Sequence, residues 1–202
     1  MDNYLVYIGV VVATIMLPGP AVVFTLNNSV MKGFSKTFAG ICGVSLGVFA
    51  IASISATSIR FVLESSLVAF TLIKVLGAAY LIYLGVKMFR TKGGLQTTAV
   101  HAQMSYFNVF FKGFLISITN PKGLVFFISI FPQFINVQEA YLPQFLLLAV
   151  TFCLLIVVIH TSYAMCAGMA KAKLSSEKGM SLLNKASGSL FVCFGVGLAT
   201  TR

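Results

Sequence analysis

The chain has 202 residues, of which 58% are hydrophobic and 9% are charged, and its mean hydropathy is +0.98. About a quarter of the residues in a soluble domain are charged, so this chain lacks the polar surface needed to remain in water. Its 14 Lys and Arg residues against 4 Asp and Glu give a net charge of +10. A basic nucleic-acid-binding domain would be less apolar, so we expect no nucleic-acid partner. The composition predicts an all-α membrane protein.

Hydropathy predicts six membrane-spanning helices in a single integral membrane domain, residues 1–202. A span needs about 20 mainly apolar residues, so six spans leave only short loops. The start of the chain lacks the basic region of a signal peptide, and we expect the first span to be retained. Proline residues in two spans also allow five spans and one re-entrant segment. The predicted spans are Tyr4–Leu26, Phe38–Ile59, Ser66–Phe89, Gly113–Phe131, Pro143–Cys166 and Leu182–Thr201.

The positive charges predict the orientation of these spans, because Lys and Arg are retained on the cytoplasmic side of a membrane. Ten of the 14 cationic residues lie in or beside three connections at one predicted face, including a basic loop at about residues 90–112. The opposite face has two, Arg60 and Arg202. We therefore expect both termini to lie outside and the three basic loops to lie in the cytoplasm.

Several classes of chemistry have no motif in this chain. There is no GxxxxGK[ST] phosphate loop, so transport would have to use a gradient rather than ATP. There is also no HExxH motif, Ser/His/Asp arrangement or paired carboxylate, which argues against an enzyme. We expect no cofactor and no metal site. The four cysteines lie in or beside apolar segments without a CxxC pair: Cys42, Cys153, Cys166 and Cys193.

The first and fourth predicted spans are interrupted by proline. Pro18 and Pro20 have no N–H group, so the carbonyl groups four residues earlier, those of Thr14 and Met16, lose their helical partners. Pro121 interrupts the fourth span in the same way. Inside a bilayer such backbone is tolerated only where it is packed or faces a wet cavity. Each interruption therefore predicts either a kink that only shapes packing or part of a functional site.

The positions of the two interruptions favour a site. Six spans divide into two inverted three-helix repeats, at about residues 1–90 and 113–202, and each repeat begins with a proline-broken helix. Broken helices in corresponding positions of two halves are the best sequence indication of a transporter's substrate site. The second span has the small-residue spacing Gly43-x-x-x-Gly47, which we expect to pack within the fold.

A set of motifs in chain order is similar to that of a known family. The first span contains Pro18-Gly19-Pro20, and the third contains Gly77-Ala-Ala-Tyr80-Leu-Ile-Tyr-Leu-Gly85. The fourth contains Asn120-Pro121-Lys122, followed by Phe131-Pro132-Gln133-Phe134. These motifs resemble the PGP, GxxYLxxLG, NPK and PQF segments of the LysE/RhtB family of amino-acid exporters, and the resemblance covers nearly the whole chain.

The resemblance implies a secondary transporter in the bacterial inner membrane that exports amino acids, driven by a proton gradient or the membrane potential. It also implies two inverted repeats and a homo-oligomer, with a dimer favoured. We expect neutral substrates such as threonine, homoserine or leucine; the alternative is an exporter or channel for small ions or metals. Many family members have an acidic residue or histidine where this chain has Val48, and no predicted span contains Asp or Glu.

Residues at the two interruptions are the main candidates for substrate binding. Gly19 and Pro20 begin a half-helix whose N–H groups suit a carboxylate, and Asn120 is expected to orient either end of a zwitterion. A charge within a span, such as Lys122, indicates function. We predict that Lys122 binds the substrate carboxylate or gates the site; the alternative is that it extends to the cytoplasmic interface.

Other candidates lie further from the interruptions. Lys74 either extends outward toward Glu64 or forms a second anion site on the exit path. Gln133 is expected to line an exit vestibule, and Tyr80 is expected to hydrogen-bond the substrate or to pack. His160 has the titration range of a proton relay, although a single histidine in a helical bundle is more often a packing residue.

Overall fold

The structure of the protein is a computed structural model. It describes residues 4–16, 19–65, 67–90, 104–136, 138–167, 169 and 176–200. These residues form helices and no strand, which confirms the all-α prediction for the described part of the chain. The helices are α1 (Tyr4–Met16), α2 (Pro20–Lys32), α3 (Phe34–Ser65), α4 (Leu67–Arg90), α5 (Tyr106–Ile118), α6 (Pro121–Ser129), the 3-10 helix η1 (Phe131–Phe134), α7 (Tyr141–Met165) and α9 (Glu177–Thr200).

Up to four membrane spans are supported by the length and composition of the described helices. The segment Phe34–Ala56 of α3 and the whole of α7 are each long and apolar enough to cross a bilayer. The pair α1 and α2 qualifies as one span bent by 59°, and the pair α5 and α6, continued through η1, qualifies as one bent by 53°. Membrane crossing by α4 and α9 stays a prediction, so the six-span arrangement is not confirmed.

Large apolar side chains cover the outer surface of these helices. Leu5 on α1 is 81% exposed, and Leu154 and Val158 on α7 are 61% and 62% exposed. Phe107 at the start of α5 is 71% exposed. Monomeric soluble proteins rarely expose contiguous apolar area on this scale, and acyl chains of lipid are the natural neighbours of such a surface.

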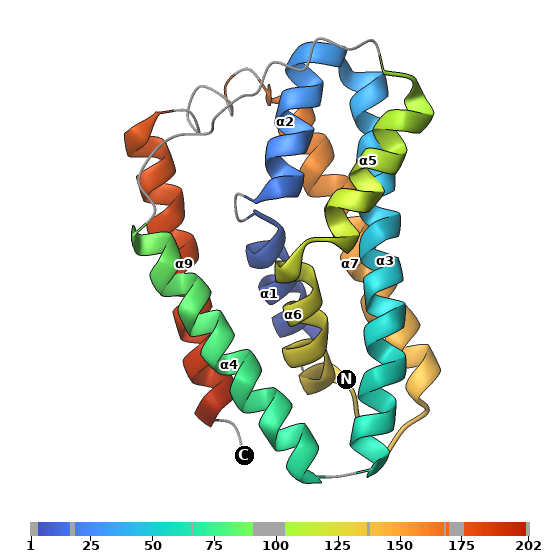
Figure 1. The fold of residues 1–202 in the computed structure, drawn as a ribbon, viewed down its shortest axis with the longest axis vertical. Coiled ribbons are helices and arrows are strands. Elements are labelled where there is room, and N and C mark those ends of the chain that lie inside the picture. The colour runs from blue at the N-terminus through green and yellow to red at the C-terminus, as the bar shows by residue number, and fades with distance from the viewer. Residues whose placement is uncertain are drawn as a thin grey trace.

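The helices of the two halves pack against one another (Figure 1). The long helix α3 contacts α5, α6 and α7, while α7 contacts both α1 and α2. Helices α4 and α9 run side by side and lean away from the other helices. Exchanging the halves exchanges these contacts, because each half's middle helix packs on the other half's broken pair. This pattern is what two inverted repeats would produce, and the repeat itself stays a prediction.

The glycines of α3 allow α5 to approach closely. A Cβ atom at Gly43 would collide with the carbonyl oxygen of Phe110, and one at Gly47 would lie 2.6 Å from that of Phe114. Only a residue without a side chain fits backbone at this separation. The expectation that Gly43-x-x-x-Gly47 packs within the fold is therefore confirmed.

Aromatic rings fill the core where α6, η1 and α7 meet α1. Ring centroids lie 5.2 Å apart for Phe127 and Phe152 and 5.1 Å apart for Tyr7 and Phe134, which is typical of packed aromatic pairs. The Tyr7 hydroxyl also donates to the carbonyl oxygen of Leu148 at 2.8 Å. We call this group the aromatic cluster: Tyr7, Phe126, Phe127, Phe131, Phe134, Phe145 and Phe152. It closes the core on the side of α1 where the chain begins.

Candidate substrate site at the two helix breaks

Lys122 joins the two broken helices. Its Nζ atom, on α6, donates to the carbonyl oxygen of Thr14 on α1 at 2.7 Å. That carbonyl would bond to residue 18 in a continuous helix, and residue 18 is a proline without an N–H group. Pro18 itself lies outside the described residues. The ammonium group thus turns inward to the first break instead of extending outward to the interface.

The second carbonyl group that the sequence leaves unpaired also has a side-chain partner. The hydroxyl of Tyr163 on α7 donates to the carbonyl oxygen of Met16 at 3.0 Å. The first break is therefore held by donors from α6 and α7, both in the second half of the chain. The need for two donors followed from the prolines, but the sequence did not identify Tyr163 as one of them.

The second break is stabilised by its own residues. The Asn120 side-chain oxygen accepts from the N–H of Lys122 at 3.1 Å, as an N-cap of α6. The N–H of Asn120 donates to the carbonyl oxygen of Ser117 at 3.0 Å, which replaces the bond that Pro121 cannot make. Proline in the first turn is compatible with a helix start. The Asn-Pro-Lys motif thus has a local structural role, with Asn120 as a cap.

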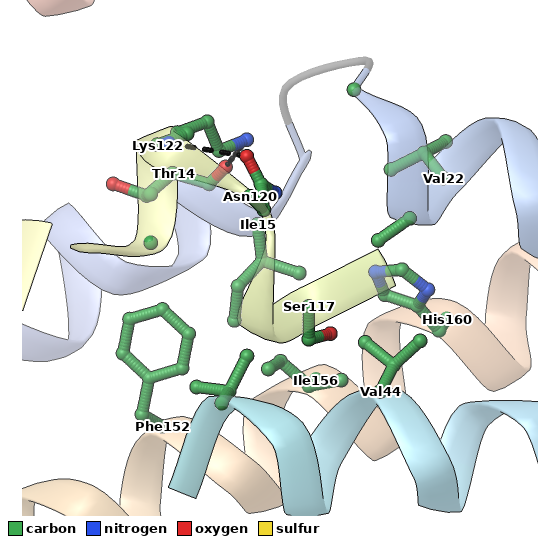
Figure 2. Close-up of a pocket in the computed structure, with 14 residues that line it drawn as sticks. Thr14, Ile15, Val22, Val44, Ser117, Asn120, Lys122, Phe152, Ile156 and His160 are labelled. Atoms are coloured by element: carbon green, nitrogen blue, oxygen red, sulfur yellow. Dashed lines mark hydrogen bonds between the residues drawn. The ribbon is translucent and has the colours of Figure 1, made fainter. Parts of the chain in front are cut away.

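A cavity of about 50 Å³ lies between the breaks (Figure 2). A water molecule needs about 10–15 Å³ by this measure, so the cavity has room for a few waters and must widen to hold an amino acid. Its walls are mostly apolar, with a small number of polar groups, as in many small-molecule sites. The residues that line it are Thr14, Ile15, Gly19, Ala21, Val22, Val44, Val48, Ser117, Asn120, Lys122, Gly123, Phe152, Ile156 and His160.

His160 lines this cavity and is also packed into the core. It is 3% exposed, and its Nδ1 atom lies 2.7 Å from the hydroxyl oxygen of Thr25 on α2. Its ring meets that of Tyr163 edge to face, with centroids 6.3 Å apart. The hydrogen bond provides the packing role considered for a single histidine. The position at the cavity is the one that a proton relay would require, and the relay stays a prediction.

Ser117 is a polar group of the cavity that sequence reasoning missed. It is 2% exposed, and its hydroxyl has no hydrogen-bond partner among the described residues. A buried polar group left unpaired costs about 1–3 kcal/mol, so a bound polar molecule would find a partner here. Its position four residues before Pro121 was the only sequence signal, and that signal concerned its backbone carbonyl.

Besides Pro18, which is not described, and Pro121, which begins α6, four predicted site residues lie away from this cavity or have side chains that are not described. Pro20 begins α2 and faces a second cavity. Tyr80 is half-buried on α4, with its ring 6.1 Å from that of Tyr83. Gln133 lies in η1, where its N–H donates to the carbonyl oxygen of Ile130 at 3.1 Å. Lys74 belongs to α4, but its side chain is not among those described.

The cavity walls contain no acidic side chain among the residues described. Val48, at the position where the resembling family often carries an acid or histidine, contributes an apolar wall. Within the described residues, no group of three or more His, Cys, Asp and Glu side chains is placed to hold a metal ion, and the four cysteines are free thiols. Lys122 therefore supplies the formal charge at the described site.

A helical membrane bundle with two broken helices facing one cavity is the architecture of a membrane translocator. Residues 12–202 match the family described as LysE type translocator, and the chain belongs to this family. The earlier resemblance to the LysE/RhtB exporters is thereby confirmed. Members of this family are transporters, and the chain is a multi-pass membrane protein.

The chain is also similar to named relatives along nearly its full length. It is 34% identical to the homoserine/homoserine lactone efflux protein of Salmonella typhi, over 92% of this chain and 90% of the relative. It is 35% identical, with the same coverage, to the protein of that name in Salmonella typhimurium. An uncharacterized membrane protein of Vibrio cholerae is 32% identical over 98% of this chain and 97% of its own. No solved structure matches the chain.

Proposed function

We propose that the protein exports small neutral amino acids, with homoserine favoured, from the cytoplasm across the bacterial inner membrane. The observation that carries this proposal is the bond from Lys122 to Thr14, which joins the two breaks beside a small cavity with mostly apolar walls and a few polar groups. The names of the Salmonella relatives support a substrate of the size and chemistry of homoserine. The charge bias of the loops supports an orientation with both termini outside.

Substrate binding would exchange the partners of Lys122. A carboxylate forms a stronger bond with an ammonium group than a neutral carbonyl oxygen does, so the substrate can take Lys122 from Thr14. The released Thr14 carbonyl oxygen and the Ser117 hydroxyl can then accept from the substrate's ammonium group. A zwitterion thus inserts between the two breaks and forms bonds with both, while the N-terminal end of α2 beside Gly19 adds a favourable dipole for the carboxylate.

Movement would follow from losing the direct bond between α1 and α6. In the described conformation this bond and the aromatic cluster add to the packing of α3 on α5 and of α7 on α1 and α2, which holds the two halves together. When the substrate separates the breaks, one repeat can rotate against the other and open the side on which the aromatic cluster lies. With both termini outside, that side faces the exterior, and Gln133 in η1 would lie on the exit path.

Energy coupling by protons would use His160 in this proposal. It lines the cavity, and its bond to Thr25 connects the cavity to α2. Protonation of His160 would add a second positive charge near Lys122, and loss of that proton would remove it. Coupling to the membrane potential would need no titrating group. Transport would therefore depend on the His160 imidazole only if it is coupled to protons.

The rest of the assembly is proposed on the same basis. The 202 residues form one membrane domain, with repeats at about 1–90 and 113–202 joined by a cytoplasmic basic loop at about 90–112. The proposed assembly is a homo-oligomer, with a dimer favoured.

Efflux from preloaded proteoliposomes tests this function. Labelled homoserine, threonine, leucine and lysine are compared under an imposed pH gradient and, separately, an imposed membrane potential. We expect export of the neutral amino acids and much slower export of lysine, because the cavity offers a cation and no carboxylate. In the His160→Gln variant, proton coupling predicts loss of the pH-gradient dependence. Correctly folded wild-type protein that exports none of these compounds would contradict the proposal.

A further inference from the structure

A second and larger cavity, of about 400 Å³, lies between α2 and α5. Residues three or four positions apart on one face of α2 line this larger cavity. Ala21 and Val22, on another face of the same helix, line the smaller cavity at the breaks. Helix α2 thus lies between the two cavities. We call the larger cavity the α2–α5 vestibule; the residues used below are Pro20, Phe24, Asn28, Lys32, Lys112 and Ile116.

The vestibule extends from the break to the basic end of the bundle. Pro20 and Lys32 are the first and last residues of α2, which are about 18 Å apart at 1.5 Å per residue. This is the end of the bundle where α2 meets α3 and where α5 begins (Figure 1). In the proposed orientation, a solute from the cytoplasm would reach the break along this cavity.

Two cations stand at this cavity without an acidic neighbour among its described walls. Lys32 and Lys112 both line it. The Nζ atom of Lys32 contacts the thioether sulfur of Met104 at 3.0 Å, and a thioether is a weak acceptor. Lys112 and Lys36 are close enough to Lys32 to repel its charge. An anion bound between these cations would relieve that repulsion and provide the strong acceptor that Lys32 lacks.

The Asn28 side chain adds a polar group to the vestibule, one helical turn before Lys32 on α2. Asn28 is 5% exposed, and its Nδ2 atom donates to the carbonyl oxygen of Phe24 at 2.9 Å. The opposite end of that amide is an oxygen, which accepts hydrogen bonds. The two lysine side chains can bind the carboxylate group of an amino acid, and the Asn28 side-chain oxygen can accept from its ammonium group. The apolar walls at Phe24 and Ile116 leave few competing polar partners.

We propose that the α2–α5 vestibule is the first binding site of the transporter, where Lys32 and Lys112 capture the carboxylate group of the substrate. The inference rests on the proposed function and adds to it a site ahead of the breaks. It explains how a carboxylate is attracted while Lys122 is still bonded to Thr14. It also predicts discrimination: homoserine carries a carboxylate, whereas homoserine lactone, an internal ester, does not and gains nothing from these lysines.

The test compares the two compounds in the double variant Lys32→Gln/Lys112→Gln. Initial efflux rates are measured below saturation from vesicles of neutral phosphatidylcholine. Losing the bonds between a carboxylate and its charged donors weakens binding about tenfold or more, so we expect homoserine export to fall at least about tenfold while lactone export stays within about twofold. Lys178→Gln/Lys185→Gln, which removes two charges of the same predicted face outside the vestibule, should change neither rate. Lys32→Arg/Lys112→Arg should retain homoserine export.

The other outcomes contradict either the vestibule proposal alone or the proposed function as well. Equal loss for homoserine and its lactone would mean that the lysines serve folding or orientation, and unchanged rates would mean that they do not meet the substrate; both overturn the vestibule proposal alone. A loss that is seen only in vesicles containing anionic phosphatidylglycerol would assign the lysines to lipid headgroups and also overturn it. A wild-type protein that exports neither compound would contradict the proposed function, and the vestibule proposal with it.

Discussion

At both helix breaks, proline leaves backbone carbonyl groups without their helical partners, and the two breaks satisfy these groups in different ways. At the second break, Asn120 caps α6 and its N–H donates to the Ser117 carbonyl oxygen, so the backbone groups there find hydrogen-bond partners within the same segment. At the first break, the carbonyl groups of Thr14 and Met16 depend on Lys122 and Tyr163, which lie 108 and 147 positions away along the chain. The second break can keep its shape while the halves move. The first break cannot, because its bonds connect the halves.

This difference assigns the two breaks separate roles. A self-contained break forms a rigid platform that positions Lys122, since the N-cap bond is made to the N–H of that same residue. A break held by distant donors responds when those donors are taken by a ligand. The substrate therefore acts on the first break, and the second break presents the charge with which it acts.

The largest expected effect comes from removing the side chain that joins the breaks. Lys122→Ala eliminates both the donor to Thr14 and the cation for the substrate, and an interaction with a charged group contributes about 1.5–3 kcal/mol. We expect homoserine export to fall more than about 100-fold, because binding and gating are lost together, as measured by proteoliposome efflux. A Lys122→Ala variant that folds and exports homoserine at the wild-type rate would contradict the separate roles of the two breaks.

A substitution at the second break should lower thermal stability and should affect transport less than Lys122→Ala does. Asn120→Ala removes the N-cap of α6, and such a loss typically costs about 1 kcal/mol. We expect a lower midpoint of thermal unfolding in detergent and a smaller fall in export than for Lys122→Ala. Asn120→Ser, which keeps a capping oxygen, is the matched control and should recover most of the stability. An Asn120→Ala variant as impaired in export as Lys122→Ala would argue for direct contact of Asn120 with substrate.

The second donor to the first break should matter less than Lys122. Tyr163→Phe removes only the hydroxyl that bonds to Met16, and a neutral hydrogen bond contributes about 1 kcal/mol or less. We expect a small loss of thermal stability and a modest change in the rate of export. Tyr141→Phe removes a comparable hydroxyl-to-carbonyl bond, to Ala56 at 3.2 Å, away from the breaks, and should leave export unchanged. Identical export phenotypes for the two variants would contradict a special role for the first break.

The smallest effect on the fold is expected at Gly123, which lines the space between the breaks. A Cβ atom there would lie 3.7 Å from the Cδ1 atom of Ile51, an ordinary contact. Gly123→Ala should therefore fold normally, export homoserine within about twofold of wild type and export leucine less well. The ratio of the two efflux rates measures this. Gly9→Ala, where the added Cβ meets nothing within 4 Å, should leave the ratio unchanged.

The sequence predicted the features that depend on local backbone chemistry. Proline has no N–H group wherever it occurs, so the two unpaired carbonyl groups and the interrupted helices followed directly from Pro18, Pro20 and Pro121. The position of Lys122 beside an interruption followed from the same segment. The all-helical architecture followed from the length and apolar character of the segments.

The partners across the fold could not be predicted in this way. The bond from Tyr163 to Met16 and the bond between Thr25 and His160 each join segments far apart in the chain, 135 positions in the second case. Helical periodicity reports which face of one helix is apolar, and it does not report which helix faces it. For the same reason, Tyr80 is suited to a site on chemical grounds, but it belongs to α4 and is not among the residues that line the cavity at the breaks.

The most direct test of the central claim is the distance between the two breaks with and without homoserine. Met16 and Leu124 are 48% and 42% exposed on α1 and α6, so Met16→Cys and Leu124→Cys, in a background without the native cysteines, accept spin labels for a pulsed electron paramagnetic resonance measurement. The exchange of partners at Lys122 predicts a longer distance when homoserine is added, and no change in the Lys122→Gln background. An unchanged distance in the otherwise wild-type protein, under conditions where it exports homoserine, would contradict the account.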